Sequence, residues 1–367
     1  MQSYRLLDPA IENKTARRTY VVATDKTASS DEFVDMMENV NPAHIQMVVD
    51  EVHNIGAPSK QKIMNIPCER RIGLSATHIR KWDEEGTEMI EQFFEGVAFT
   101  YTLQEAIDDE MLCQYEIHNH DVTLTQHEYE NYHEHTRTIG KYNAIIQQYR
   151  EKRNFTEMNR YEKKKENEQQ TRARIIKGAS NKFLAFEEIA KELNANEKTI
   201  VFCENIVQLD ACSRILNKYS KNYRIYHTGS ELNNTQRAEH LKEFERGDSD
   251  ILVGIGCLDE GLDISGCSTC ILVSSDGNER QYIQRRGRVL RLGEIGKIAH
   301  IHDLICYPPL LTDEVIEEQL TTVTSLLKHE MKRSDLLSEA ANNREAVQNE
   351  LEEKFNEFNI SVEELRD

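Results

Sequence analysis

The chain has 367 residues and a formal net charge of −19, so acidic residues dominate its surface. That length exceeds what one ordinary hydrophobic core organises, and two domains with extensions are expected. No apolar run is long enough to span a bilayer, and residues 1–9 lack the apolar core of a signal peptide. The composition therefore predicts a cytoplasmic protein without a membrane segment.

The first hundred residues predict a short α/β segment that ends in an acidic pair. Residues 19–23 and 45–49 are apolar runs of strand length, and residues 32–37 have the spacing of a helix. The second run delivers Asp50 and Glu51 to its carboxyl end. Taken alone, an acidic pair after a strand is an ordinary polar loop.

Residues 137–182 differ from the rest of the chain in charge. Thirteen Lys or Arg residues stand against five Glu, a local balance of +8, with aromatic residues interleaved. A solvated helical hairpin between two domains has a similar composition. The positive excess also fits an arm that follows the phosphates of a nucleic acid. In that second interpretation Lys163, Lys164 and Lys165 are candidate phosphate contacts.

The following hundred residues alternate apolar runs with helical patterns. Such alternation predicts a parallel sheet with helices on both faces, and ligands bind such sheets at the carboxyl ends of the strands. The predicted strands are residues 198–203, 223–227, 250–254, 269–274 and 299–305, with helices at 206–219 and 234–246.

Residues 282–291 hold four arginines within ten positions of an acidic chain. Helical spacing places Gln284, Arg288 and Arg291 on one face, and Gly287 leaves room for close approach. That face suits a triphosphate, although an isolated arginine run is more often a solvated basic helix face.

The C-terminal residues, from 310 onward, are helical in pattern and strongly acidic. One apolar stripe is expected to pack on the preceding domain while the remaining faces are solvated. The stripe consists of Leu320, Val323, Leu326, Leu327 and Met331.

Four segments, taken in order, resemble the motifs of superfamily 2 helicases. Residues 48–53 resemble the DExH box and residues 74–77 resemble motif III. Residues 256–264 resemble motif V, and residues 284–291 resemble motif VI. The resemblance covers about residues 20–306 and is to the XPB-like and restriction-type DNA translocases.

This resemblance implies an α/β fold with two RecA-like parallel-sheet domains, the first truncated at its N-terminus. The first domain would occupy residues 1–108. A linker strand and a basic helical insertion would follow at 109–185. The second RecA-like domain would span 186–309, and an acidic helical tail 310–367.

The family also implies an ATP-dependent motor that uses Mg²⁺ and moves on nucleic acid, with double-stranded DNA as the expected partner. In the family the residue matching Asp50 holds the magnesium ion through water, and the one matching Glu51 activates the attacking water. His53 would relay the nucleotide state to motif III. The motif III residues in that role are Ser75, Ala76 and Thr77.

In the second domain the resemblance assigns a further set of contacts. Gly229 and Ser230 would touch the nucleic-acid backbone. Glu260, Gly261 and Asp263 would connect that backbone to the nucleotide, unless Gly261 and Asp263 are simply turn residues. Arg288 and Arg291 would be the fingers that reach across the cleft toward the phosphate, with Gln284 beside them.

One motif of the family is missing from the sequence. A phosphate loop requires G-x-x-x-x-G-K-S/T before a helix. Neither Gly140-Lys141 nor Gly296-Lys297 has the earlier glycine or the following hydroxyl. Because the loop supplies several hydrogen-bond donors and a lysine, the chain alone is expected to hydrolyse ATP negligibly. The first domain is also expected to expose a sheet edge and an apolar face.

Three functions fit these features. The chain could be the larger piece of a translocase or helicase whose phosphate loop lies on a separate chain or was lost by truncation. It could instead be a non-hydrolysing nucleic-acid-binding or regulatory subunit, or a truncated remnant. Retention of Glu51, Arg288 and Arg291, which only catalysis needs, favours a motor or a recent remnant over a long-adapted binding subunit.

Overall fold

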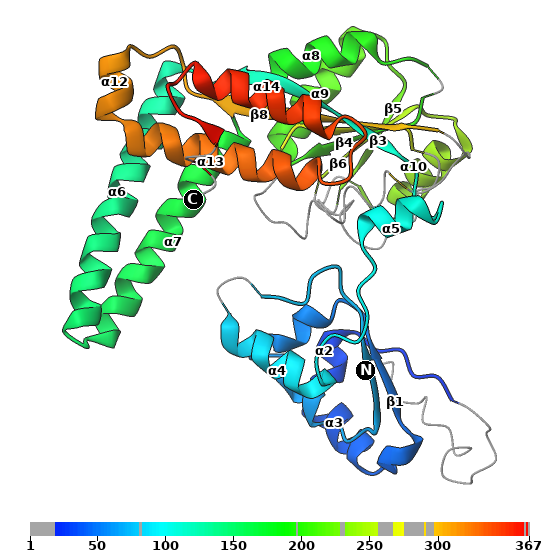
Figure 1. Ribbon diagram of the computed structural model, residues 1–367. Coiled ribbons are helices and arrows are strands. Elements are labelled where there is room, and N and C mark those ends of the chain that lie inside the picture. Colours follow the sequence, from blue (N-terminus) through cyan, green and yellow to red (C-terminus); the bar gives the residue numbers. More distant parts are fainter. Residues whose placement is uncertain are drawn as a thin grey trace. The chain divides into compact units, whose positions relative to one another are not determined.

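The chain divides into two compact units, Met1–Thr100 and Tyr101–Asp367 (Figure 1). The computed structural model describes residues 19–80, 83–195, 197–227, 232–255, 267–274, 290, 297–362 and 365. Both units combine parallel strands with helices, which confirms the predicted α/β class. Within the described ranges, no helix has both the length and the apolarity needed to cross a membrane.

The first unit is built on two parallel strands, β1 (Gln46–Val49) and β2 (Arg70–Gly73). Met47 and Val49 of β1 belong to or pack against a buried core on one face of this pair. The helices of the unit are α2 (Asp25–Ala28), α3 (Asp31–Glu38) and α4 (Glu84–Phe94), with 3-10 turns η2 (Pro42–His44), η3 (Val52–Gly56) and η4 (Gln61–Asn65). The predicted strand at 45–49 and helix at 32–37 are confirmed.

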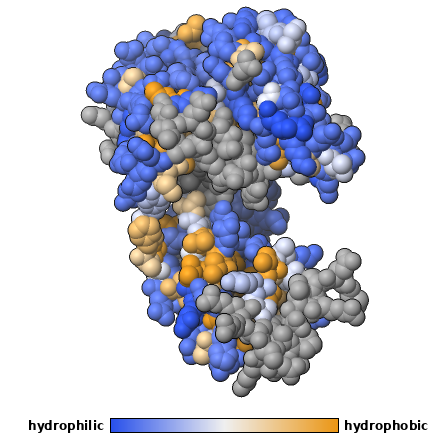
Figure 2. Space-filling model, turned by 90° about the vertical axis from the view of Figure 1, so that its right-hand side faces the viewer, coloured by the Kyte–Doolittle hydropathy of each residue, from blue (hydrophilic) through white to orange (hydrophobic). Residues whose placement is uncertain are grey.

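The other face of this two-stranded sheet is exposed among the described residues. Val48 and Ile72 are partners in the strand register, and their exposed fractions are 57% and 44%. Leu74, just beyond β2, is 51% exposed. Figure 2 shows hydrophobic side chains gathered on the surface of this unit, in the lower part of the view. Parallel sheets are ordinarily covered on both faces. The exposed side chains of Val48, Ile72 and Leu74 confirm the predicted open apolar face.

The prediction of a strand at residues 19–23 is wrong. The segment has no strand pairing, and Tyr20 and Val22 are 80% and 95% exposed. An apolar run becomes a strand only where another strand offers backbone partners. In the described part of this unit, β1 and β2 pair with each other and no third strand joins them.

The second unit contains a six-stranded parallel sheet in the order β3-β8-β7-β4-β6-β5. Its strands are β3 (Tyr115–Thr123), β4 (Thr199–Cys203), β5 (Tyr223–Tyr226), β6 (Ile251–Ile255), β7 (Thr269–Leu272) and β8 (Ala299–Tyr307). All five strands predicted in the second half of the chain are present. The strand predicted as a linker, β3, pairs with β8 from Tyr115↔Ala299 to Thr123↔Tyr307 and forms an edge of this sheet.

Two buried clusters lie on opposite faces of this sheet. Along β4, Val201 and Cys203 join one cluster, and Ile200 and Phe202 join the other. Successive side chains of a strand point to opposite faces, so β4 is buried on both. Among the helices that contribute, α8 (Lys182–Glu192) and α9 (Ile206–Lys218) pack in the first cluster, and α10 (Asn234–Arg246) packs in the second through Phe244.

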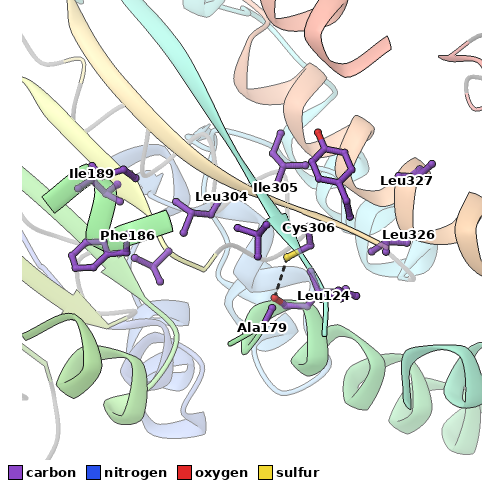
Figure 3. Close-up of a cluster of buried hydrophobic side chains, with 14 of the residues drawn as sticks. Leu124, Ala179, Phe186, Ile189, Leu304, Ile305, Cys306, Leu326 and Leu327 are labelled. Carbon is purple, nitrogen blue, oxygen red and sulfur yellow. Dashed lines mark hydrogen bonds between the residues drawn. The ribbon is translucent and has the colours of Figure 1, made fainter. Parts of the chain in front are cut away.

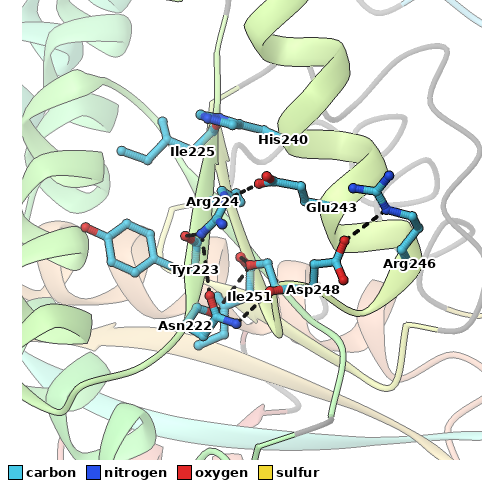
Figure 4. A network of polar contacts seen from close by, with 10 residues as sticks. Asn222, Tyr223, Arg224, Ile225, His240, Glu243, Arg246, Asp248 and Ile251 are labelled. Atoms are coloured by element: carbon cyan, nitrogen blue, oxygen red, sulfur yellow. Dashed lines mark hydrogen bonds and ion pairs between the residues drawn. The ribbon is translucent and has the colours of Figure 1, made fainter.

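A polar network fixes α10 against β5 (Figure 4). Arg224 of β5 forms an ion pair with Glu243 of α10. The His240 Nδ1 atom lies 2.7 Å from the carbonyl oxygen of Ile225. Gly247 ends the helix with φ +82°, a conformation that favours glycine. These contacts hold α10 against the middle of β5.

The C-terminal helices are part of the second unit rather than an appendage. They are α12 (Asp313–Glu318), α13 (Leu320–Leu337) and α14 (Arg344–Asn356). Leu326 and Leu327 of α13 belong to the same buried cluster as Leu304 and Cys306 of β8 (Figure 3). The predicted stripe is therefore confirmed except for Leu320, which is 51% exposed.

Three charged side chains are buried where α13 meets β8. The Nη2 atom of Arg333 lies 3.0 Å from Asp303 Oδ2 and 2.8 Å from Glu330 Oε2. Glu330 Oε2 also accepts a hydrogen bond of 3.0 Å from the backbone N–H of Cys306. Burial disfavours the charged form of Glu330, but Arg333 and His329 outweigh burial and hold its pKa at about 2. The tail is thus attached by a paired, buried charge cluster.

Candidate functional site

The predicted acidic pair lies where β1 ends. Leu74 donates its N–H to the carbonyl of Val49 at 2.8 Å, and Val52 donates to the carbonyl of Leu74 at 2.9 Å. These two hydrogen bonds continue the pairing of β1 and β2 past their last residues. Asp50 and Glu51 are therefore brought beside residues 75–77, as expected for the carboxyl ends of adjacent parallel strands.

Asp50 has an exposed carboxylate, and its Oδ1 atom accepts a 2.9 Å hydrogen bond from the N–H of Glu51. Exposed carboxylate oxygens suit Mg²⁺, which keeps most of its water and binds through few protein groups. The residues present therefore fit a magnesium ion held through water. A triphosphate lacks a comparable site, because the sequence contains no phosphate-loop motif to supply backbone N–H donors and a lysine.

Glu51 adopts a left-handed backbone conformation with φ +47° and ψ +52°. A residue other than glycine pays about 1 kcal/mol or more for this conformation, which recurs at functional sites. The bend lets the chain turn from β1 directly into η3. It leaves the Glu51 side chain 35% exposed, with its Oε2 atom 3.3 Å from His53 Nδ1.

His53 connects the acidic pair to the segment after β2. Its side chain is 7% exposed, and its Nδ1 atom lies 3.0 Å from Ser75 Oγ. Ser75 Oγ donates in turn to the carbonyl of Thr77 at 2.7 Å. Ala76, between them, is exposed. The structure thus brings His53, Ser75 and Thr77 together, and the relay role assigned to them stays a prediction.

Arg80 and Asp83 support this site, although sequence reasoning missed them. Arg80 donates through Nη1 to the carbonyl of His53, and its Nε lies 2.7 Å from Asp83 Oδ2. The hydrogen bond from Arg80 lowers the pKa of Asp83. Gly56 permits this packing, because a Cβ there would lie 2.7 Å from both Arg80 Cδ and the carbonyl oxygen of Gly86. The Arg-x-x-Asp spacing at a helix start was the available signal.

The basic insertion is a helical hairpin. Helices α6 (Gln126–Glu151) and α7 (Phe155–Lys177) lie side by side along their length (Figure 1). The turn between them includes Arg153 with φ +53°. The base of the hairpin is fixed to α13. His133 Nδ1 lies 2.7 Å from Thr322 Oγ1, and Arg172 donates to Ser325 Oγ at 3.1 Å.

Some basic residues of the insertion serve the fold rather than a ligand. Lys182 is 1% exposed, Lys177 pairs with Glu204 at 2.9 Å, and Arg172 anchors the hairpin base. The positive charge available to a ligand is therefore concentrated on the outer part of the hairpin. The exposed basic residues there are Arg150, Lys152, Arg153, Arg160 and Lys163.

The three predicted phosphate contacts lie on α7 beside an aromatic cluster. Lys163 is exposed, and Lys164 and Lys165 are half-buried. The Nζ atom of Lys164 lies 4.7 Å from the centre of the Tyr161 ring, which stacks on Tyr149 at 5.7 Å. Their role in binding a nucleic acid stays a prediction.

The remaining predicted site residues lie outside the described part of the structure. They are Gly229, Ser230, Glu260, Gly261, Asp263, Gln284, Arg288 and Arg291. The strands that lead to two of these segments are described. β5 and β6 pair in parallel, with Tyr226 opposite Gly254. The segments that follow the two strands therefore leave the sheet on the same side, at the carboxyl ends of the strands.

The comparison with protein families places a known domain in the second unit. Residues 181–293 match the helicase conserved C-terminal domain. The chain is 22% identical over 255 residues to the DNA 3'-5' translocase XPB2 of Sulfurisphaera tokodaii, a match that covers 67% of this chain and 55% of that protein. It is 30% identical over 120 residues to the DEAD-box ATP-dependent RNA helicase RhpA of Helicobacter pylori, covering 33% of this chain and 24% of RhpA.

A solved structure extends the likeness over both units. The ATP-dependent Type ISP restriction-modification enzyme LlaBIII bound to DNA matches 87% of this chain and 22% of that chain, with a TM-score of 0.50 and 16% identity. At this identity the likeness concerns the fold. The chain spans about half the length of XPB2, at 55%, and a smaller share of the other two proteins.

Proposed function

We propose that this chain, which belongs to superfamily 2 of the helicases and has their RecA-like parallel-sheet fold, is the larger part of an ATP-dependent translocase that moves on nucleic acid. The observation that carries the proposal is the contact of His53 with Ser75 at the carboxyl ends of β1 and β2. This contact joins the acidic pair, Asp50 and Glu51, to residues 74–77, the segment that resembles motif III. A motor needs such a connection to couple the nucleotide state to movement.

The proposed division of labour follows from the positions of the side chains. A bound nucleotide and its magnesium ion supply the phosphoryl transfer, which depends on positioning and charge more than on covalent help. Asp50, exposed at the end of β1, orients the metal through water. Glu51 takes the proton of the attacking water. His53, held between Glu51 and Ser75, senses which state the site is in.

We further propose that a polypeptide segment outside these 367 residues supplies the phosphate loop. Two observations support this. The sequence has no G-x-x-x-x-G-K-S/T motif, so the donors that cradle a triphosphate must come from elsewhere. The sheet of the first unit also has an open apolar face at Val48 and Ile72. The helix that follows a phosphate loop would cover such a face, and the strand before the loop would pair with the edge of the sheet.

Double-stranded DNA is the proposed track, and the α6–α7 hairpin its proposed contact. The exposed basic residues and the exposed Phe155, at 60%, gather toward the turn of the hairpin. XPB2 is a DNA 3'-5' translocase and the LlaBIII structure is bound to DNA, and this chain matches them over 67% and 87% of its length. An acidic chain that binds DNA needs such a local basic surface, because its net charge repels phosphates.

Replacing Lys163, Lys164 and Lys165 together by Ala is expected to weaken DNA binding and its dependence on salt. If the hairpin makes six or more phosphate contacts, affinity falls roughly a thousandfold between 50 and 200 mM salt. Each lost contact lowers the slope of log K against log salt by about 0.9. Fluorescence anisotropy with a labelled duplex measures both slopes.

The matched control for this experiment replaces Lys191 and Lys218 by Ala. These lysines lie on α8 and α9 and pair with Glu188 and Glu187. The control is expected to keep the wild-type slope. A salt slope in the triple variant that equals that of the wild type would show that the hairpin does not grip DNA.

A further inference from the structure

Five polar side chains form two adjacent rows on β3 and β8, namely Glu116, His118 and His120 on β3 and His300 and His302 on β8. The strands are parallel and in register, so Glu116 lies opposite His300, and His118 lies opposite His302. His120 follows on β3. Because alternate residues of a strand share a face, all five side chains project on the same side of the sheet. The nucleotide motifs, in contrast, follow the carboxyl ends of strands.

We propose that Glu116, His118 and His300 form a binding site for one Zn²⁺ ion. Their ligand atoms all lie within 4.8 Å of one another. His118 Nε2 is 3.0 Å from His300 Nδ1, and that same Nδ1 is 3.8 Å from Glu116 Oε2. Two imidazoles and one carboxylate, with an open fourth position, are a ligand set typical of zinc.

The distances suit an ion placed between these three groups. Zinc–nitrogen bonds are about 2.0–2.1 Å long, and tetrahedral geometry then separates two nitrogen ligands by about 3.3 Å. The present separation of 3.0 Å needs to open by only a few tenths of an ångström. Glu116, on the same strand as His118, reaches the ion by a side-chain rotation.

A metal ion can replace the hydrogen bond between His118 and His300 if one imidazole changes its tautomer. A neutral imidazole carries one N–H, so one ring of the His118–His300 pair donates and the other accepts. When the ion binds, the donating ring moves its proton to its other nitrogen. Both facing nitrogens then offer lone pairs to the ion.

The outer pair of histidines is favoured over the inner pair for three reasons. His120 and His302 form a similar contact of 2.9 Å, but the described residues place no carboxylate with them at ligand distance. The side chains of His300 and Glu116 are 42% and 34% exposed, which gives an ion and its water access. The carboxylate also supplies a negative charge that the inner pair lacks.

A zinc ion at this site would join an edge strand to its neighbour. β3 is held to the sheet by β8, which is its hydrogen-bonding partner among the described strands. Ligands from both strands would resist their separation. Metal binding that occurs only in the folded state adds directly to stability, so zinc is expected to raise the melting temperature of the chain.

The test is titration of the untagged, chelator-treated chain with Zn²⁺, followed by calorimetry and by melting temperature. We expect one equivalent of zinc to bind and to raise the melting temperature. His118→Ala and His300→Ala are expected to weaken zinc binding on the order of a hundredfold or more. Even the loss of a residue that only hydrogen-bonds to a metal ligand lowers metal affinity about 10–100-fold. Co²⁺ in place of Zn²⁺ should give the visible absorption of a four-coordinate site.

Two further variants keep the test decisive. Glu116→Gln leaves both histidines and their hydrogen bond in place, so the protein folds while zinc binding weakens. His127→Ala removes an exposed histidine on α6 and is expected to bind zinc as the wild type does. Zinc binding that is absent from the wild type, or unchanged in His118→Ala, His300→Ala and Glu116→Gln, would overturn the proposal.

Discussion

Glu51→Gln is expected to lower DNA-stimulated ATP turnover by about a hundredfold or more in a form of the protein that has a phosphate loop. Glutamine keeps the shape of the side chain and its contact distance to His53, but it cannot accept the proton of an attacking water. Glutamine has nearly the same size as glutamate, so the left-handed backbone at this position and the fold of the acidic turn should persist. The loss should therefore appear in kcat, with nucleotide binding retained.

The protein for this measurement is a chimera in which a strand, a phosphate loop and a helix are fused before Thr19. Steady-state ATP hydrolysis with and without duplex DNA gives kcat and KM. Glu88→Gln, on an exposed position of α4, is the matched control and should behave as the unmodified chimera does. Equal turnover in the Glu51→Gln chimera would remove Glu51 from the proposed role.

Arg333→Met is expected to destabilise the second unit by about 3–5 kcal/mol, because it leaves two buried carboxylates without their cation. Asp303 and Glu330 are both 0% exposed, and Arg333 is within 3.0 Å of each. Burial already raises the pKa of Asp303, and removal of Arg333 takes away the charge that opposes this rise. Urea unfolding followed by circular dichroism measures the loss.

A triple variant separates the charge effect from a packing effect. Replacing Asp303 by Asn and Glu330 by Gln together with Arg333→Met removes every ionised group of the cluster. Substituting a buried ion cluster as a whole is often neutral or stabilising, so most of the lost stability should return. A destabilisation of Arg333→Met below about 1 kcal/mol would mean that water or another group compensates the carboxylates.

The elements that could be predicted from the sequence are those specified by local pattern. β4 is apolar at nearly every position because both of its faces are buried, and α9 and α10 follow with helical spacing. Residues 19–23 have the same local composition as a strand and are not one. The difference is the absence of a pairing partner in the described sheet, which no local pattern reveals.

The features that could not be predicted from the sequence are contacts between residues far apart in the chain. The two histidine pairs join residues 182 positions apart, and their meeting depends on the register of β3 with β8. The pairing of Arg333 with Asp303 depends on how α13 crosses that strand. In contrast, the contact of His53 with Ser75 could be expected, because both residues belong to motifs of a family that the sequence resembles.

The most direct test of the proposed function is ATP hydrolysis by the purified chain, measured with and without duplex DNA. The chain alone should show no turnover that depends on Glu51, while the chimera with a phosphate loop should show DNA-stimulated turnover that Glu51→Gln abolishes. DNA-stimulated, Glu51-dependent turnover by the chain alone would contradict the account, because the phosphate site would then be built from this chain's own residues.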